Sequence, residues 1–383
     1  MPNFTTHRQK RAMEGRGMPK TLELTGLKKT FRASGRDETN ALDEVSVALE
    51  PGELLVLLGP SGCGKSTTLR SIAGLESPDA GTIRLGDQVV FDSARKVDLT
   101  PERRDIGMVF QSFALWPHMT VEQIVRFPLT ARRVDRATAE RRVRSALELV
   151  NCEDLSRRHP GELSGGQQQR IALARALVAE PSVLLFDEPL SNLDAGLRAD
   201  LRSEIDRVHQ TAGFTGVYVT HDQVEALAVA DRIAVMNAGS LVQIGTAIEV
   251  YRRPYSEWVA GFMGFTNRIV RASQTAAAAN GPADGPNAAF RFRPESIRTA
   301  STGRDGELAV DGTVIQASFV GHAIEYKVDV DGDIVDARVP TNWSDGSPET
   351  LAPGAPLRLY VPSEDLLAYD IAGGSANPVE ALA

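Results

Sequence analysis

A glycine-rich segment at residues 59–67, GPSGCGKST, contains the residue types that bind phosphate groups. It matches GxxxxGK[ST], follows an apolar run at 53–58 and precedes the helix-like TLRSIAGL, which is the context that this motif requires. Backbone N–H groups of such a loop converge on phosphate oxygens, while Lys65 would reach the β- and γ-phosphates and the Ser66 hydroxyl would bind Mg²⁺. We therefore predict a nucleotide site formed by Gly59, Ser61, Gly62, Cys63, Gly64, Lys65, Ser66 and Thr67.

An acidic segment, VLLFDE at residues 183–188, places two carboxylates directly after an apolar run. Asp187 suits the coordination shell of Mg²⁺, and Glu188 is placed to orient or deprotonate an attacking water. Many buried strands end in an acidic residue, so this pattern is weak by itself. Downstream of a phosphate-binding loop, it favours hydrolysis of the bound nucleotide.

The elements that must position these residues follow an α/β pattern from about residue 22 to 243, because short apolar runs alternate with helix-like stretches. The runs at 54–58 and 183–186 are almost wholly apolar, as expected of central strands covered on both faces. Residues from about 118 to 163 are mostly helical in pattern. We predict that they form a helical insert in the α/β domain.

The pattern changes after an Ala-, Gly- and Pro-rich stretch at 273–289, which reads as a linker. Short alternating strands are predicted at 312–319, 324–330 and 334–339, with a hairpin signal in Val-Asp-Val-Asp-Gly-Asp. They predict a small all-β barrel or sandwich. The predicted organisation is a disordered tail at 1–20, a nucleotide-binding domain at 21–253 and a β-rich domain at 254–383.

Composition excludes several classes of protein. The chain of 383 residues, 42% hydrophobic and 24% charged, allows two or three domains and excludes wholesale disorder. No apolar run approaches the ~20 residues of a membrane span, and the basic N-terminus lacks the apolar segment of a signal peptide, so we expect a cytoplasmic protein. Two cysteines are too few for a disulfide framework or a zinc cluster. The net charge is −8, and residues 301–383 carry 14 acidic and 4 basic side chains, a net of −10, which argues against nucleic acid as a partner.

The string LSGGQQQR at 163–170, with SNLD at 191–194, Gln111 and the Thr220–His221 pair, resembles the ATP-binding cassette (ABC) family. This resemblance covers residues ~21–245 almost without interruption, and it implies a P-loop NTPase cassette with a helical subdomain that binds ATP and Mg²⁺. It also implies a homodimer in which this loop of one chain covers the γ-phosphate of ATP held by the other chain. A mere N-capped helix start is the structural alternative. The residues that would cover the phosphate are Ser164, Gly165, Gly166 and Gln167.

The same resemblance assigns roles to four further residues. Gln111 would contact Mg²⁺ and the attacking water, Asp194 would organise the dimer interface, and His221 would hydrogen-bond the γ-phosphate. Phe31 would stack on adenine, although a core aromatic at a strand end is the alternative for it. Cys63 permits a redox interpretation, but a small side chain without a role of its own is favoured. The implied catalytic set is Glu188, His221, Gln111 and Lys65, and the implied metal set is Ser66, Gln111 and Asp187.

Two stretches, 111–129 and 291–297, resemble the ATPase subunits of maltose, polyamine and ferric-iron importers, and the terminal β-rich part resembles their OB-like regulatory domain. The resemblance implies an ATP-hydrolysing motor, peripheral on the inner face of the cell membrane. Its partners would be integral-membrane permease subunits and, indirectly, a solute-binding protein. Ferric iron is the favoured solute, with polyamine, sugar or another small solute as alternatives. A regulatory ATPase without a membrane partner is a second class of function that stays open.

A group of apolar and mostly aromatic residues follows Gln111 in the sequence. A soluble monomer is not expected to expose such a cluster unless a partner covers it. We predict a groove, lined partly by Trp116, that accepts a short cytoplasmic helix of the permease. Packing of Trp116 inside the helical insert is the alternative. The members of the cluster are Phe113, Leu115, Trp116, Met119 and Phe127.

Overall fold

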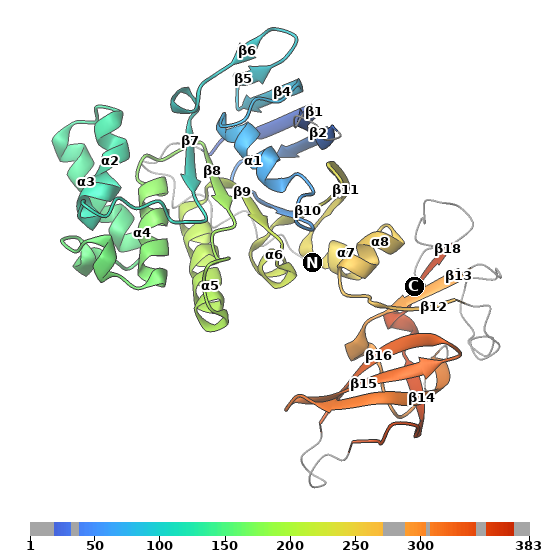
Figure 1. The fold of residues 1–383 in the computed structure, drawn as a ribbon. Helices are drawn as coiled ribbons and strands as arrows, with labels where there is room; N and C mark the ends of the chain where they lie inside the picture. The colour runs from blue at the N-terminus through green and yellow to red at the C-terminus, as the bar shows by residue number, and fades with distance from the viewer. Residues whose placement is uncertain (1–18, 32–37, 271–287, 304–306, 342–349, 371–383) are drawn as a thin grey trace, which may run out of the picture. The chain divides into compact units, whose positions relative to one another are not determined.

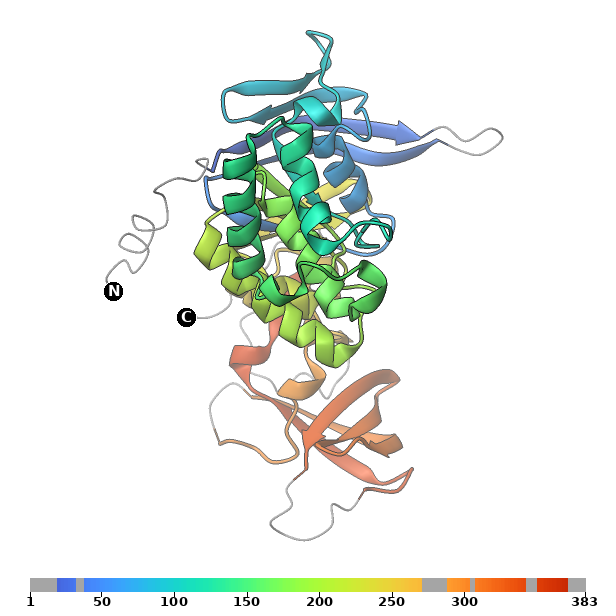
Figure 2. The same ribbon diagram turned by 90° about the vertical axis from the view of Figure 1, so that its left-hand side faces the viewer.

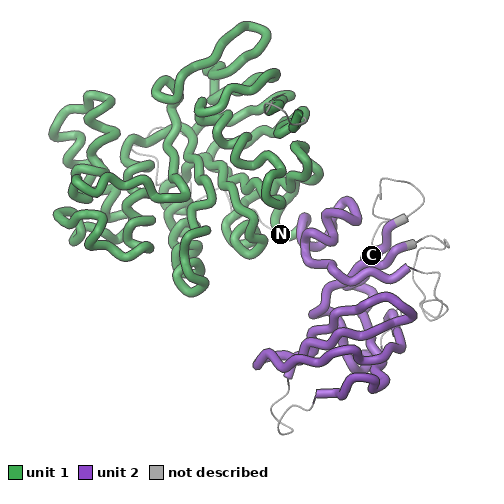
Figure 3. Tube along the Cα trace, viewed as in Figure 1, with its two compact units in different colours: residues 1–248 green, residues 249–383 purple. Residues whose placement is uncertain are grey.

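The computed structural model describes residues 19–31, 38–270, 288–303, 307–341 and 350–370. Contacts within the chain divide it into two units, residues 1–248 and 249–383, which Figure 3 draws in different colours. The units have separate sheets and separate hydrophobic cores. The predicted tail and the predicted linker lie almost wholly outside the described residues.

A six-stranded sheet forms the centre of the first unit, in the order β11-β10-β3-β9-β8-β7 (Figure 1). The strands from β10 to β7 pair in parallel, and β11 is antiparallel at the edge. Every residue of β3, β8 and β9 is buried, which explains why these segments read as continuous apolar runs. The strands are β3 (Leu54–Leu58), β7 (Ile106–Val109), β8 (Val183–Asp187), β9 (Thr215–Thr220), β10 (Arg232–Asn237) and β11 (Ser240–Gly245).

The two faces of this sheet are covered differently. Leu55, Leu57 and their counterparts on β8–β10 share a core with helix α1 and with an antiparallel sheet, β2-β1-β4-β5-β6. Alternate residues such as Phe186 and Tyr218 pack on the other face, which α5 and α6 cover (Figure 1). These elements are α1 (Lys65–Ala73), α5 (Ala195–Ala212), α6 (Gln223–Val229), β1 (Leu22–Phe31), β2 (Thr39–Leu49), β4 (Ala80–Leu85), β5 (Gln88–Asp92) and β6 (Val97–Asp98).

Three helices make a separate layer, which faces the viewer in Figure 2. They are α2 (Val121–Ala131), α3 (Arg136–Leu149) and α4 (Gly165–Leu177), and they contact one another. Thr120 caps α2 and Asp135 caps α3 through side-chain oxygens that accept backbone N–H bonds. The predicted insert at 118–163 thus contains α2, α3 and two short 3₁₀ turns, at 153–155 and 160–162.

The second unit contains two antiparallel sheets, β12-β13-β18 and β16-β15-β14-β17. Its core is apolar and includes Phe292, Val328 and Leu359. The hairpin predicted at Asp331–Gly332 joins β15 to β16, and both residues have positive φ there. The elements are α7 (Ala247–Arg252), which spans the division, α8 (Glu257–Phe262), β12 (Asn267–Val270), β13 (Ala288–Phe292), β14 (Leu308–Phe319), β15 (Ala323–Val330), β16 (Asp333–Pro340), β17 (Pro356–Val361) and β18 (Leu367–Asp370).

The structure confirms the predicted fold class, a P-loop α/β domain with a helical layer and then an all-β part. The predicted strands at 312–319, 324–330 and 334–339 lie within β14, β15 and β16. None of the helices in the described ranges is long and apolar enough to cross a membrane.

Candidate active site

The predicted catalytic residues come from loops that follow four neighbouring strands. The glycine-rich loop follows β3, His221 follows β9, Glu188 follows β8, and Gln111 lies two residues after β7. These strands are adjacent and parallel in the order β3-β9-β8-β7, so their carboxyl ends meet at one edge. That edge of a parallel sheet is where α/β proteins bind nucleotides. Topology therefore brings together residues that are up to 162 positions apart in the chain, from Gly59 to His221.

The glycine-rich loop wraps around the Lys65 ammonium group. Nζ donates to the carbonyl oxygens of Gly59 at 2.8 Å and Pro60 at 2.9 Å, and the residue is only 4% exposed. Gly64 caps α1 with φ +108°, and a Cβ there would lie 2.4 Å from the carbonyl oxygen of Ala41, so the position requires glycine. The loop thus presents the N-terminus of α1, with its free N–H groups, to a phosphate.

Asp187 is the buried carboxylate of the site. It is 8% exposed, and burial raises its pKa, while Arg70 at 4.0 Å and a hydrogen bond with Ser66 act in the opposite direction. A carboxylate beside a hydroxyl is a donor pair that Mg²⁺ accepts. Among the described residues no cluster of three or more His, Cys, Asp or Glu side chains exists, so phosphate oxygens would have to complete the shell. Asp187 and Ser66 therefore fit this cation.

Replacing Asp187 by Asn should stabilise the protein without nucleotide. A carboxyl group whose pKa is raised in the folded state reduces stability as pH rises through the window above its unfolded pKa, and an amide removes that cost. We therefore expect a higher Tm than that of the wild type at pH 7. Thermal unfolding in the presence of EDTA measures the Tm. An Asp187→Asn protein that melts at a lower temperature than the wild type would contradict the raised pKa of Asp187. With Mg-ATP present the wild type should have the higher Tm, since the variant binds the cation less well.

Glu188 and His221 lie next to each other at the ends of β8 and β9. Nδ1 of His221 is 3.3 Å from a carboxylate oxygen of Glu188, and both side chains reach solvent. Glu188 has φ +43°, an uncommon conformation for a residue with a side chain. Its backbone N–H donates to the Val219 carbonyl at 3.1 Å, which extends the parallel pairing of β8 with β9 to Glu188. The site therefore holds a carboxylate and an imidazole at the same edge as Lys65.

Two supporting residues were not identified by sequence reasoning. Glu225 is 4% exposed and accepts hydrogen bonds from the Thr220 hydroxyl at 2.8 Å and from the Tyr218 hydroxyl at 3.1 Å, which anchors the strand end before His221. Asn192 donates from Nδ2 to the Gln111 carbonyl at 3.0 Å and joins the loops after β7 and β8. Glu225 lies three residues after Asp222, which caps α6, and an acidic residue at that distance from a helix cap was the available signal.

The LSGGQ segment begins helix α4. Ser164 accepts a backbone N–H bond from Gln167, and the Gln167 side chain accepts one from the Ser164 N–H, which is a complete capping box. A Cβ on Gly166 would lie 2.8 Å from Cδ1 of Leu197, so a larger residue there would require the leucine side chain to shift. Asp194 caps α5 through one bond, in which its Oδ1 accepts from the Leu197 backbone N–H at 2.9 Å. The N-capped helix start, which was the structural alternative for this segment, is therefore present. It is compatible with a role of the same residues toward a partner's nucleotide.

Two further candidates can be placed. Phe31 ends β1 and is 42% exposed, with Lys29 Nζ 5.2 Å from its ring centre, so it is not a core aromatic. Cys63 is 3% exposed, with Sγ 3.8 Å from Lys65 Nζ. Its burial suits the small-residue interpretation.

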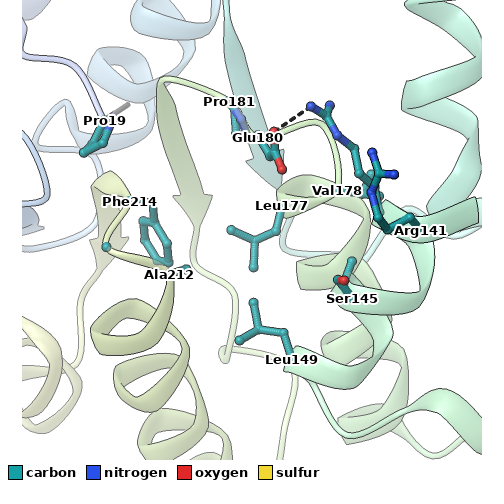
Figure 4. A pocket seen from close by; sticks show the side chains of 13 residues that line it. Pro19, Arg141, Ser145, Leu149, Leu177, Val178, Glu180, Pro181, Ala212 and Phe214 are labelled. Atoms are coloured by element: carbon teal, nitrogen blue, oxygen red, sulfur yellow. Dashed lines mark ion pairs between the residues drawn. The ribbon is translucent and has the colours of Figure 1, made fainter. Parts of the chain in front are cut away.

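A cavity of about 380 Å³, drawn in Figure 4, is lined by none of these site residues. Pro181 and Phe214 line it, and they precede β8 and β9, so it opens at the amino edge of the sheet rather than at the carboxyl edge. An ion pair of 2.8 Å between Arg142 and Glu180 stands at its rim. The cavity is therefore not the nucleotide site.

Comparison with known families agrees with this geometry. Residues 42–191 match the family described as ABC transporter, and residues 292–368 match the TOBE domain. The chain is 43% identical over 350 residues to the Fe(3+) ions import ATP-binding protein FbpC of Rhizobium etli. This alignment covers 87% of this chain and 95% of that protein. This chain belongs to the ABC transporter family. It is an ATP-binding, ATP-hydrolysing cassette of the importer type, followed by an OB-like domain.

Other relatives differ in what they import. The chain is 53% identical over 227 residues to the trehalose/maltose import ATP-binding protein MalK of Thermococcus litoralis, which covers 59% of this chain and 61% of that protein. It is 47% identical over 292 residues to the sn-glycerol-3-phosphate import ATP-binding protein UgpC of Burkholderia cenocepacia, 76% of this chain and 78% of that protein. A solved dimeric ATP-binding cassette, MJ0796 with ADP and Pi, has TM-score 0.50 and 29% identity, covering 59% of this chain and 98% of that one.

Proposed function

We propose that this protein is the motor subunit of a binding-protein-dependent importer, which couples ATP binding and hydrolysis in a homodimer to solute uptake through separate permease subunits. The convergence of Lys65, Asp187, Glu188 and His221 at one sheet edge carries the proposal. The protein would act at the inner face of the cell membrane, where the permease would hold it. Relatives named as import ATP-binding proteins support the proposal.

In the proposed mechanism Glu188 accepts a proton from the attacking water, or orients that water, because its carboxylate is solvent-accessible and lies at the sheet edge. Lys65 leaves its carbonyl partners to contact the β- and γ-phosphates, and His221 hydrogen-bonds the γ-phosphate. Asp187, Ser66 and Gln111 would hold Mg²⁺, which neutralises charge on the transferred phosphoryl group. Phe31 would stack on adenine, since its ring is exposed at the end of β1.

Each composite site is proposed to need two chains. Ser164 and the glycines after it begin α4, which belongs to the helical layer, whereas Lys65 begins α1 on the core side of the sheet (Figure 1). A second copy would bring its Ser164 to the γ-phosphate held by this chain's Lys65, with Asp194 near the dimer interface. The dimeric state of the solved MJ0796 cassette supports this arrangement.

The remaining parts of the proposal concern the β-rich region and the solute. Residues 21–253 would form the ATPase and 254–383 a regulatory domain that dimerises or receives a signal. Ferric iron is the proposed solute, because the iron-import relative is matched over 95% of its length. Relatives that import sugars or spermidine and putrescine make those solutes the alternatives. Uptake of radiolabelled solutes by the complex in vesicles, with its cognate binding protein, tests the choice.

The surface after Gln111 is proposed to contact the permease. Trp116 is half-buried and packs against Phe127 of α2, which is 44% exposed; the ring centres are 4.6 Å apart and the rings are tilted by 49°. We expect cysteine substitutions at Phe113, Leu115 and Met119 to crosslink to a cytoplasmic loop of a co-expressed permease and to lower transport, while basal ATPase activity survives. Crosslink mapping and vesicle uptake measure this.

A cysteine at Ser145, on α3 and beside the cavity at the other sheet edge, is the matched control and should not crosslink. If all variants of the cluster fail to fold, or if none crosslinks while the permease co-purifies, the cluster is core and this contact is wrong. Failure of any integral-membrane protein to co-purify with the wild-type chain would favour the regulatory ATPase instead.

A further inference from the structure

Arg175 is a buried cation near the end of α4 that contacts the loop after β7. Its guanidinium donates to the Phe113 carbonyl at 3.0 Å and to the Ala114 carbonyl. The residue is only 7% exposed, and no ion pair of Arg175 is found among the described residues. Burying a charge without a carboxylate is unfavourable unless its hydrogen bonds are made. The two carbonyls therefore provide the compensation that keeps Arg175 in this position.

The two acceptor residues are held in an unusual backbone conformation. Phe113 and Ala114 have φ +60° and +49°, although neither is glycine. The N–H of Ala114 donates to the Ser112 carbonyl at 2.6 Å, and that of Phe113 donates to the Phe110 carbonyl at 3.0 Å. Left-handed residues with side chains persist where their surroundings determine them. A planar guanidinium presents two parallel donors, which match two successive carbonyls.

The same loop is tied to the catalytic edge and to α2. Asn192, four residues after Glu188, bonds the Gln111 carbonyl. On the far side of the turn, the Trp116 ring centre is 5.6 Å from the Arg175 guanidinium carbon, and Trp116 packs on Phe127. Residues 111–116 thus connect the glutamate's loop, the helix that begins with the LSGGQ segment, and α2.

We propose that Arg175 is the positioning residue that fixes the 111–116 loop to α4, so that movement of α4 during dimer closure displaces the Trp116 surface. The proposal deepens the proposed function and rests on it for the permease. The contact itself is a property of this chain and can be tested without the permease. Lysine is a poor substitute for Arg175, because its ammonium lacks the rigid planar fork of the guanidinium and its nitrogen ends one bond short of the terminal guanidinium nitrogens.

Trp116 is a native reporter of this movement. Replacing Trp258 and Trp343 by Phe leaves it as the single tryptophan of the full chain. With Arg175 present, Mg-ATP should change its emission. With Arg175→Lys, the amplitude should fall about fivefold or more, while the Kd for ATP stays within about threefold, since the shorter lysine lacks the fork that fixes both carbonyls. An unchanged amplitude, or no response with Arg175 present, overturns the proposal.

A second-site change separates positioning from simple packing. Glycine adopts the left-handed region without strain but supplies no bond to α4, so Ala114→Gly should not restore the signal in the Arg175→Lys background. Arg142→Lys, a half-buried arginine of α3 paired with Glu180, is the matched control and should leave the signal intact. Rescue by Ala114→Gly would show that Arg175 only stabilises the left-handed backbone, and it would overturn the proposed link to α4.

Hydrogen exchange of the unsubstituted chain gives a test that does not depend on any variant folding. Backbone amides at 113–116 and those of α4 should change protection together when Mg-ATP is added. Independent changes would overturn the proposal. A Trp116 signal that Arg175→Lys does not change refutes the role of Arg175 and leaves the proposed function untouched. A chain that never associates with a permease refutes the proposed function and leaves the role of Arg175 untouched.

Discussion

Replacing Glu188 by Gln is expected to lower steady-state ATP turnover by roughly 10²–10⁴-fold, the usual contribution of a general base or of a group that orients water. The amide has the same shape but cannot accept the proton. ATP binding should persist, because the phosphate contacts come from the loop after β3 and the glutamate lies after β8. Phosphate release at saturating Mg-ATP measures turnover, and titration with a fluorescent ATP analogue measures binding.

The same variant should accumulate as an ATP-bound dimer, since the closed state forms and hydrolysis no longer resolves it. Sedimentation with Mg-ATP would detect that dimer, and ADP should not support it. Glu140→Gln, an exposed glutamate of α3 that pairs with Arg136 at 2.8 Å, is the matched control and should hydrolyse ATP normally. Near wild-type turnover in Glu188→Gln would show that another group handles the water.

Lys65→Ala and Ser164→Arg are each expected to lose nearly all ATPase activity, and mixing the two proteins should restore part of it. A heterodimer of the two has one site with both defects and one site with neither. Random pairing makes half of the dimers heterodimers, so about a quarter of the wild-type activity should return if the sites act independently. Lys65→Ala alone should also weaken ATP binding, because the ammonium group lies within the phosphate-binding loop.

The complementation has a built-in control. Ser164 caps α4, so Ser164→Arg costs helix stability, and Ser164→Gly keeps an acceptable cap while removing the hydroxyl. Mixtures of Lys65→Ala with Ser164→Gly should therefore behave in the same direction. If Lys65 and Ser164 act within one chain, no mixture recovers activity, and the composite-site model of this protein fails.

Much of this protein could be predicted from local sequence. The strand before Gly59, the helix after it and the apolar run before Asp187 were found at the expected places, because buried parallel strands and helix-capping residues leave local patterns. The hairpin at Asp331–Gly332 was likewise visible in its turn residues. Roles carried over from family resemblance, such as adenine stacking by Phe31, remain predictions.

The amino-acid sequence by itself determined which groups are available for chemistry: a phosphate loop with Lys65, a strand ending in Asp187 and Glu188, and a capped helix start at Ser164. Their types and short-range spacing suffice, since loop and helix geometry depend on neighbours in the chain. Only the tertiary structure decided that His221 lies 3.3 Å from Glu188 and that Arg175 contacts Phe113, 62 residues away. Such contacts depend on the order of strands in the sheet and on how α4 packs, and neither leaves a periodic signal along the chain.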